Sequence, residues 1–194
     1  VALGSMSVSS FMGNLNFMKG NLNQALEGYL WNFIDSHDTA RFLHSAGHDT
    51  GKHRLAAALQ LLLPGMPMIY YGDETALEGG PDPDCRRGML WDENRRNKEM
   101  LGYYQTLLKI RHEHPVLTEG EILEQYTKDA DGLIYIKRCL KGQSVILLFH
   151  AKEGEVSLPA LQGQRNLISG RAFSGSLGGY EAAVLIDEKE TLQA

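Results

Sequence analysis

The sequence has few cysteines and no long apolar run. Two cysteines in 194 residues, Cys85 and Cys139, are too few for a disulfide framework or a Cys-X-X-Cys zinc site, so we expect free thiols. No run of about 18 apolar residues is present, so we expect no membrane-spanning helix. No signal peptide is visible after Val1, but this says little about a longer protein, so the location stays unknown, with a cytoplasmic one slightly favoured over a periplasmic or secreted one.

Positive charge is also scarce. The chain has 19 Lys and Arg against 24 Asp and Glu, a formal net charge of −5, and its basic residues form no cluster. A surface of this kind does not attract polyanions, so we expect neither nucleic acid nor a membrane among the partners. The remaining composition, 43% hydrophobic and 22% charged, is that of a folded globular chain long enough to bury a core.

Two short apolar runs, Trp31–Asp35 and Met66–Tyr71, have the length and the flanking residues of buried strands. A helical stripe over His53–Leu63 separates them and ends at a Pro-Gly pair. A strand, a helix and a strand in this order predict a βαβ unit with parallel strands. The titratable residues that follow the two strands, His37-Asp38 and Asp73-Glu74, are therefore expected at one rim of the sheet.

The residues after the first of these strands have two interpretations. Asp38 or Thr39 could cap the next helix, since a helical turn is expected from Thr39. Alternatively, His37 and Asp38 carry the chemistry, because barrel enzymes place catalytic residues in the loops that follow their strands. Asp73 and Glu74, after the second strand, are interpreted as structural groups that hydrogen-bond the rim.

Periodicity assigns most of the remaining first half. Residues 1–20 follow no sustained period and are expected to form a loop or a disturbed helix entry, whereas Asn21–Leu30 has the spacing of a short amphipathic helix. Glu78–Asp92 is rich in Gly, Pro and charge, and loops of that length tend to be functional. A helical period resumes at Asn97 and ends before His114.

Beyond Pro115 the apolar period changes from the helical one to the alternation that is typical of strands. The Asp-Gly and Lys-Gly pairs at Asp131 and Lys141 suit tight hairpins. Residues 118–194 are therefore expected to form an antiparallel β-sandwich or barrel. We expect its strands at Glu121–Tyr126, Leu133–Leu140, Ser144–His150, Glu155–Leu158, Gln164–Ile168 and Tyr180–Ile186.

Four motifs follow one another along the chain: Ile-Asp-Ser-His-Asp-Thr (34–39), Pro-Gly-Met-Pro-Met-Ile-Tyr-Tyr-Gly-Asp-Glu (64–74), Gly-Gly-Pro-Asp-Pro-Asp-Cys-Arg-Arg-Gly-Met-Leu-Trp (79–91) and Arg-His-Glu-His-Pro (111–115). Together they resemble the last quarter of the α-amylase family of glycoside hydrolases. The third motif is closest to the branch of neopullulanases, cyclomaltodextrinases and maltogenic amylases. The resemblance implies an α/β plus all-β fold, in which residues 1–117 hold strands seven and eight of a (β/α)8 TIM barrel with their helices, and residues 118–194 are an all-β C-terminal domain.

The resemblance also implies a chemistry and a substrate. The family hydrolyses α-glucosidic bonds with retention, using an Asp nucleophile on strand four, a Glu acid on strand five and a third carboxylate on strand seven. Asp38 matches this third carboxylate, which stabilises the transition state through sugar hydroxyls, and His37 matches a histidine that binds the same sugar. Asp82 and Arg86 match loop residues that bind glucose units further along, although the two could instead pair with each other to brace the loop. Trp91 either stacks on a sugar or anchors the core or the loop.

The implied partners are α-glucan oligosaccharides: maltooligosaccharides, cyclodextrins, pullulan or starch, cleaved at α-1,4 bonds, with α-1,6 bonds as a further candidate. The motifs of strands four and five are absent from the sequence, so the chain alone is expected to be inactive, as a part of a larger enzyme. The alternative is a non-catalytic amylase-like subunit that binds glucan or a partner protein. The resemblance implies no cofactor for this chain. It allows a calcium site in the part of the longer enzyme that this chain does not contain, and it suggests that the longer enzyme is a homodimer.

No metal ligand is expected within the chain. Asp82 and Asp84 fall short of the roughly six to eight oxygens that calcium takes. His44, His48 and His53 have separations that would suit a metal, but they lie around a helix interrupted by glycine. They are interpreted as solvated or packing side chains.

Overall fold

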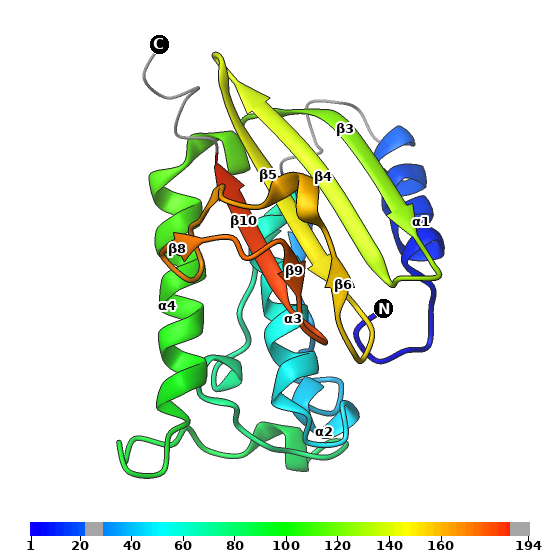
Figure 1. Cartoon of the computed structure of the whole chain (residues 1–194). Coiled ribbons are helices and arrows are strands. Elements are labelled where there is room, and N and C mark those ends of the chain that lie inside the picture. Colours follow the sequence, from blue (N-terminus) through cyan, green and yellow to red (C-terminus); the bar gives the residue numbers. More distant parts are fainter. Residues whose placement is uncertain (22–28, 187–194) are drawn as a thin grey trace.

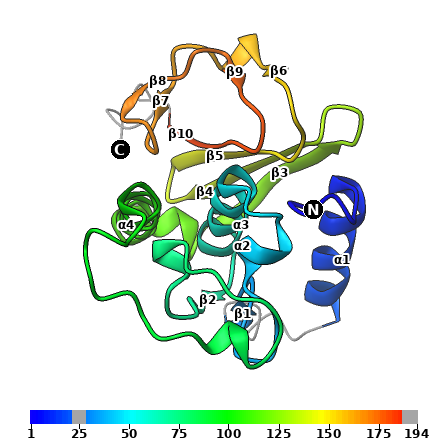
Figure 2. The same cartoon turned by 90° about the horizontal axis from the view of Figure 1, so that it is seen from below.

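The computed structural model describes residues 1–21 and 29–186. A six-stranded antiparallel sheet forms the middle layer, with helices on one face and two short strands over the other (Figures 1 and 2). The helices are α1 (Val8–Gly20), α3 (Thr50–Leu62) and α4 (Lys98–Glu113), and the short strands are β6 (Val156–Ser157) and β9 (Ser176–Leu177). Among the described residues, no helix combines the length and the apolarity needed to cross a membrane.

The predicted βαβ unit is confirmed. Strand β1 (Trp31–Asn32) pairs in parallel with β2 (Met66–Pro67), and α3 lies between them in the chain. Both strands are shorter than predicted, and the expectation that they are buried is wrong for this chain. The side chains of Trp31, Phe33 and Met66 are 64%, 54% and 45% exposed, because the two strands have no further sheet neighbour within the described residues.

A capping side chain sets the start of each long helix. The Asp49 carboxylate accepts two backbone N–H groups of the first turn, at 2.8 and 3.1 Å, so α3 begins before the predicted His53. Asn97 caps α4 in the same way at 2.9 Å. That helix ends before His114, as predicted.

Residues 1–20 are predicted to be a loop or a disturbed helix entry, and the loop alternative is wrong, because Val8–Gly20 forms α1. Val8 and Met12, one turn apart, are buried in the core, and the backbone N–H and hydroxyl of Ser9 donate to the Asp129 carboxylate at 2.9 and 2.5 Å. These tertiary contacts stabilise a helix whose own apolar period is weak. The helix predicted at Asn21–Leu30 falls largely on residues 22–28, which lie outside the described residues.

The second half of the chain forms a sheet in the order β3-β4-β5-β10-β7-β8, and every neighbouring pair is antiparallel. Its strands are β3 (Glu121–Lys128), β4 (Leu133–Leu140), β5 (Gln143–His150), β7 (Arg165–Asn166), β8 (Arg171–Ala172) and β10 (Ala182–Ile186). The six predicted strands correspond to β3 to β7 and β10. Strands β8 and β9 were not predicted, because two residues are too few to show alternation. Short 3-10 turns are η2 (Asp73–Thr75), η3 (Asp84–Arg86), η4 (Pro115–Leu117) and η5 (Pro159–Leu161).

The sheet packs on the helices through one hydrophobic core. Alternate residues of the central strands belong to the cluster that includes residues of α3 and α4, and their neighbours belong to the cluster on the opposite face. The helix-facing cluster includes Leu55, Leu61, Tyr104, Leu107, Ile134, Ile136, Leu147 and Phe149, and the opposite cluster includes Leu133, Leu148, Phe173, Leu177 and Leu185. Cys85 is buried and Cys139 half-buried, and the prediction that both are free thiols is confirmed.

Candidate functional site

The four site residues predicted from the sequence lie together in the structure. Asp38 is at the centre, since its Oδ1 atom is 3.2 Å from His37 Nε2 and 3.6 Å from Arg86 Nη2. Arg86 Nε donates to Asp82 Oδ1 at 2.6 Å, so the alternative pairing of these two side chains is present as well. The side chains of His37, Asp38, Arg86 and Asp82 are 57%, 72%, 48% and 56% exposed, so a ligand in solution can reach all four.

A tight turn presents the Asp38 carboxylate. The Ser36 N–H donates to Thr39 Oγ1 at 3.1 Å, and the Asp38 N–H donates to Ser36 Oγ at 3.2 Å. The predicted helical turn at Thr39 is wrong, because α2 spans Phe42–Ser45. The interpretation of Asp38 or Thr39 as a helix cap is wrong too, since the first N–H of α2 donates to Asp35 Oδ2 at 2.6 Å. The Asp38 carboxylate belongs to the ion-pair cluster instead.

The loop after β2 is held in shape by its own polar contacts. Asp84 Oδ2 accepts the Gly80 N–H at 2.7 Å, and both oxygens of Asp84 accept Arg87 nitrogens at 2.7 Å. The hydrogen bonds from Arg87 lower the pKa of Asp84. Gly79 is required by close approach, because a Cβ atom there would lie 2.7 Å from the Asp84 carbonyl oxygen. These contacts place η3, and with it Arg86, beside the loop between β1 and α2 that carries Asp38.

Arg41 is fully buried and joins the two loops. Its backbone N–H donates to the Gly79 carbonyl at 2.9 Å, and its Nε donates to the Cys85 carbonyl at 2.8 Å. Nη1 donates to the Tyr71 carbonyl at 2.7 Å, and the guanidinium carbon lies 3.9 Å from the centre of the Tyr70 ring. A planar guanidinium with several fixed donors is suited to hold three segments in one geometry.

Two buried carboxyl groups accompany Arg41. Its Nη1 lies 3.3 Å from Asp73 Oδ1. Burial, together with the neighbouring Asp35 carboxylate, raises the pKa of Asp73 to about 9, and burial raises the pKa of Asp35 as well. Asp35 Oδ1 and Asp73 Oδ2 have no hydrogen-bond partner in the described structure. A protonated Asp73 can donate a hydrogen bond to the Asp35 carboxylate, and this bond would give the two groups a partner in each other. Near neutral pH the raised pKa keeps a proton on Asp73, which lowers the negative charge buried beside Arg41.

The free energy of unfolding is expected to fall as the pH rises from about 7 to about 9, because the folded chain keeps the Asp73 proton and the unfolded chain does not. The slope from this group is at most about 1.4 kcal/mol per pH unit. Burial lowers the pKa of His53 to about 4, so the folded imidazole is uncharged over this range, and an unfolded histidine has lost most of its charge by about pH 7.5. Asp73→Asn keeps a neutral side chain and should flatten the slope, as measured by urea unfolding at several pH values. An unchanged slope in this variant contradicts a shared proton.

Part of this buried network was missed by the sequence interpretation. Asp73 and Glu74 were interpreted as groups that hydrogen-bond the rim, and this is confirmed, since Glu74 accepts the Gly72 N–H at 2.8 Å. Asp35 and Arg41 were assigned no role. The position of Asp35 could have indicated a functional carboxylate, because Asp35 is the polar residue that ends an apolar run. A buried arginine has no periodic signature, and its partners come from distant parts of the chain.

The histidines separate into two groups. His53 is buried, with Nε2 3.4 Å from the Tyr104 hydroxyl, and its interpretation as a packing side chain is confirmed. His44 and His48 are exposed and solvated, at α2 and the turn after it. Together with Glu78, they form the one group of side chains in residues 1–21 and 29–186 whose geometry could hold a metal ion.

Trp91 does not belong to the core, because its side chain is 78% exposed. Arg96 donates to the Leu90 and Trp91 carbonyls at 2.6 and 3.1 Å, and its guanidinium carbon is 5.7 Å from the centre of the indole ring. The backbone at the end of the loop is thus fixed while the indole faces solvent.

Known proteins resemble this chain in sequence. The family model described as "Alpha amylase, catalytic domain" matches residues 4–120. Neopullulanase 2 of Thermoactinomyces vulgaris is 40% identical over 139 residues, which cover 72% of this chain and 23% of that protein. A cyclomaltodextrinase of Thermoanaerobacter pseudethanolicus is 37% identical over 142 residues, which cover 72% of this chain and 24% of that protein. The chain therefore spans about a quarter of the length of these curated relatives.

Solved structures resemble it in fold. A maltogenic amylase from S. marinus superimposes with a TM-score of 0.82 at 26% identity, over 94% of this chain and 26% of that one. A cyclic α-maltosyl-(1→6)-maltose hydrolase from Arthrobacter globiformis gives a TM-score of 0.80 at 29% identity, over 95% of this chain and 40% of that one. Since both cover nearly the whole chain, the likeness includes the antiparallel sheet as well as the helices.

Proposed function

Since the chain belongs to the α-amylase family of glycoside hydrolases, we propose that it is the C-terminal part of a retaining α-glucan hydrolase. Its solved neighbours are α-amylase-family enzymes with a TIM-barrel catalytic domain, and the antiparallel sheet is consistent with a C-terminal domain. In this proposal residues 1–117 are the last two βα units of the barrel, with β1 and β2 as strands seven and eight. Residues 118–194 are the all-β domain.

The observation that carries the proposal is the exposed cluster of His37, Asp38, Asp82 and Arg86. Carboxylates, an imidazole and a guanidinium offer directional hydrogen bonds, which suit a ligand rich in hydroxyl groups. We assign to Asp38 the role of accepting hydrogen bonds from sugar hydroxyls as the ring distorts toward an oxocarbenium-like transition state. His37 binds the same sugar, and Asp82 and Arg86 bind a glucose unit further along. None of the four attacks or protonates the glycosidic bond.

The short parallel sheet supports a larger barrel. Trp31, Phe33, Met66 and Tyr71 are large apolar or aromatic side chains exposed near β1 and β2, and adjacent barrel strands in the complete protein, meaning the longer protein that contains this chain, would cover such a surface. We propose that the nucleophile and the acid/base lie on those strands. The chain by itself is then inactive, and turnover of a maltooligosaccharide by the purified 194-residue chain would contradict this.

Arg86→Ala in the complete protein is expected to raise KM for maltooligosaccharides roughly 10- to 100-fold, with a smaller change in kcat. This is the effect of losing a charge-assisted hydrogen bond of about 1.5–3 kcal/mol that is made to both the ground state and the transition state. Steady-state kinetics with a series of maltooligosaccharide lengths measures it.

Arg87→Ala is the matched control, because Arg87 lies on the same loop and pairs with Asp84 instead. It should raise KM by no more than about fivefold, because an exposed pair of this kind contributes at most about 1 kcal/mol to the shape of the loop. Equal effects of the two variants would mean that loop shape, rather than a contact from Arg86, controls affinity, and the assignment of Arg86 would fail.

The substrates we propose are maltooligosaccharides, cyclodextrins, pullulan or starch, cleaved at α-1,4 and also α-1,6 bonds, in keeping with the names of the relatives. The α-amylase family generally needs no organic cofactor, and we propose none here. A homodimeric complete protein and a cytoplasmic location are further proposals, and one relative is named an intracellular maltogenic amylase. A non-catalytic binding subunit is the alternative, and an Asp and a Glu at the strand-four and strand-five positions of the complete protein would exclude it.

A further inference from the structure

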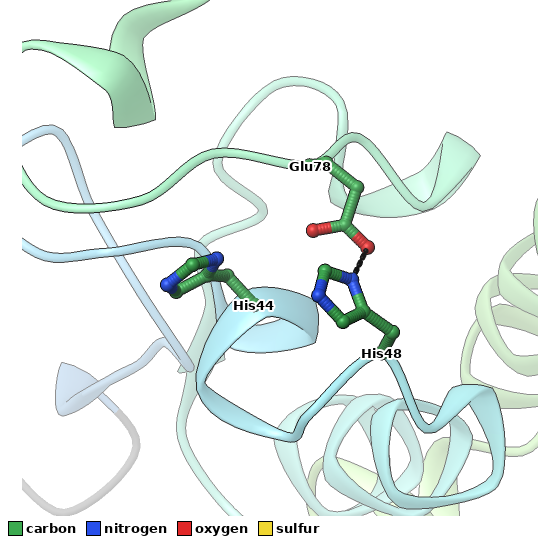
Figure 3. Close-up of side chains that lie close together, drawn as sticks. All are labelled: His44, His48 and Glu78. Atoms are coloured by element: carbon green, nitrogen blue, oxygen red, sulfur yellow. Dashed lines mark hydrogen bonds and ion pairs between the residues drawn. The ribbon is translucent and has the colours of Figure 1, made fainter.

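We propose that His44, His48 and Glu78 form a binding site for Zn²⁺. The three side chains come from two segments of the chain and lie close together, with His48 facing Glu78 and the His44 ring beside them (Figure 3): His44 is on α2, His48 is in the turn that follows it, and Glu78 begins the loop that carries Arg86. Their candidate ligand atoms all lie within 4.8 Å of one another. This site is separate from the proposed sugar-binding cluster and does not depend on it.

The turn at the end of α2 brings the two histidines together. The Gly47 N–H donates to the His44 carbonyl at 3.0 Å, and the His48 N–H donates to the Leu43 carbonyl at 2.9 Å. Gly47 and His48 both have left-handed backbone angles, with φ of 67° and 64°. That conformation is uncommon for a residue other than glycine, and it turns His48 back so that the two ring centres are 5.9 Å apart.

Glu78 completes the group from the other side. Its Oε1 lies 2.7 Å from His48 Nδ1, whereas its Oε2 is buried and has no hydrogen-bond partner in the described structure. A buried carboxylate oxygen without a partner costs free energy, and a bound cation would remove that cost. Asp84 is nearby but is already bonded to Arg87 and Gly80, which leaves the fourth zinc position to water.

The ligand set fits zinc. Imidazole nitrogens and a carboxylate oxygen bind Zn²⁺ at about 2.0–2.2 Å, and three such ligands with one water form a common tetrahedral site. Neighbouring ligands of such a site are about 3.3 Å apart, so no pair of ligand atoms here has to approach by more than about 1.5 Å. His44 and His48 are exposed, so their rings can rotate, and the ion can enter from solvent.

The backbone that carries the ligands is already fixed. Arg41, which directly precedes α2, donates its backbone N–H to the carbonyl of Gly79, the residue after Glu78, at 2.9 Å. The buried Arg41 side chain holds the same loop through the Cys85 carbonyl. The binding of the ion therefore requires movement of side chains only, which keeps the ordering cost low.

Titration of the metal-free 194-residue chain with ZnCl₂ by isothermal calorimetry at neutral pH tests the proposal. We expect one Zn²⁺ per chain. His44→Gln, His48→Gln and Glu78→Gln should each weaken binding by at least the roughly 10- to 100-fold that loss of an outer-shell partner costs. Co²⁺ in the same site should give the intense visible bands of tetrahedral coordination, and the three variants should lose them.

His112→Gln is the matched control, because His112 is an exposed histidine on α4 outside this group, and it should bind Zn²⁺ like the parent. Circular dichroism of each variant checks that the fold is kept, which is expected because the substituted histidines are exposed and Glu78→Gln keeps the size of a half-buried side chain. The absence of Zn²⁺ binding to the folded chain, equal affinity in all four variants, or an octahedral Co²⁺ spectrum would each overturn the proposal. In the first case the contact between His48 and Glu78 is an ion pair only.

Discussion

In the complete protein, Asp38→Asn is expected to lower kcat roughly 100- to 1000-fold, the range seen when one preorganised group that stabilises transition-state charge is removed. The carboxylate is 72% exposed in this chain and contacts only His37 and Arg86 among the ion pairs of the described residues, so the fold does not depend on it. An amide has the same shape but no charge, and it accepts hydrogen bonds less strongly. The loss should appear in kcat more than in KM, because the interaction strengthens in the transition state.

Asp92→Asn is the matched control, since Asp92 is an exposed aspartate at the end of the loop after β2 and bonds only the local Asn94 N–H, at 2.9 Å, in the described hydrogen bonds. It should keep nearly full activity. Thermal unfolding of both variants separates lost chemistry from lost structure. Near-normal turnover by the folded Asp38→Asn variant would remove Asp38 from the active site, while the family membership of the chain would stand.

The features that were predicted correctly depend on local sequence. The pairing of β1 with β2 follows from two apolar runs around a helix, and α4 follows from a sustained period with Asn97 at its start. Strand β4 matches its predicted bounds because its residues alternate and an Asp-Gly turn precedes it. The clustering of Asp38 with Arg86 was reachable too, since residues after parallel strands share one rim.

The features that were missed depend on contacts between distant segments. Helix α1 is stabilised by burial of Val8 and Met12 and by Asp129, which is over 100 residues away in the chain. Strands β1 and β2 are short because a strand needs hydrogen-bonded neighbours as well as apolar side chains. The role of Arg41 depends on carbonyl groups of three other segments, which no periodicity can reveal.

Arg41→Met should be the most destabilising change to this chain. It removes a fully buried cation and leaves Asp35 and Asp73 without their positive partner, a situation that typically costs about 3–5 kcal/mol. It also leaves the Cys85 and Tyr71 carbonyls without a donor. Urea unfolding of the chain near pH 7 measures the difference. Arg54→Met is the matched control, because the Arg54 pair with Glu99 is exposed, and its loss should cost less than about 1 kcal/mol.

The pH dependence of the stability lost in Arg41→Met tests whether the unpaired charge of the buried carboxyl groups causes the loss. Arg41 favours the ionised form of Asp35 and lowers its pKa, so Asp35 in the Arg41→Met variant should hold a proton to higher pH in the folded state. A carboxyl whose pKa is raised by folding makes stability fall as the pH rises, because the unfolded chain releases that proton first. The stability deficit of Arg41→Met should therefore be smaller near pH 4 than near neutral pH, by the part that depends on the charge of Asp35. If the cost is the same at both pH values, lost packing on Tyr70 and lost carbonyl contacts explain it, and the charge balance between Arg41, Asp35 and Asp73 does not.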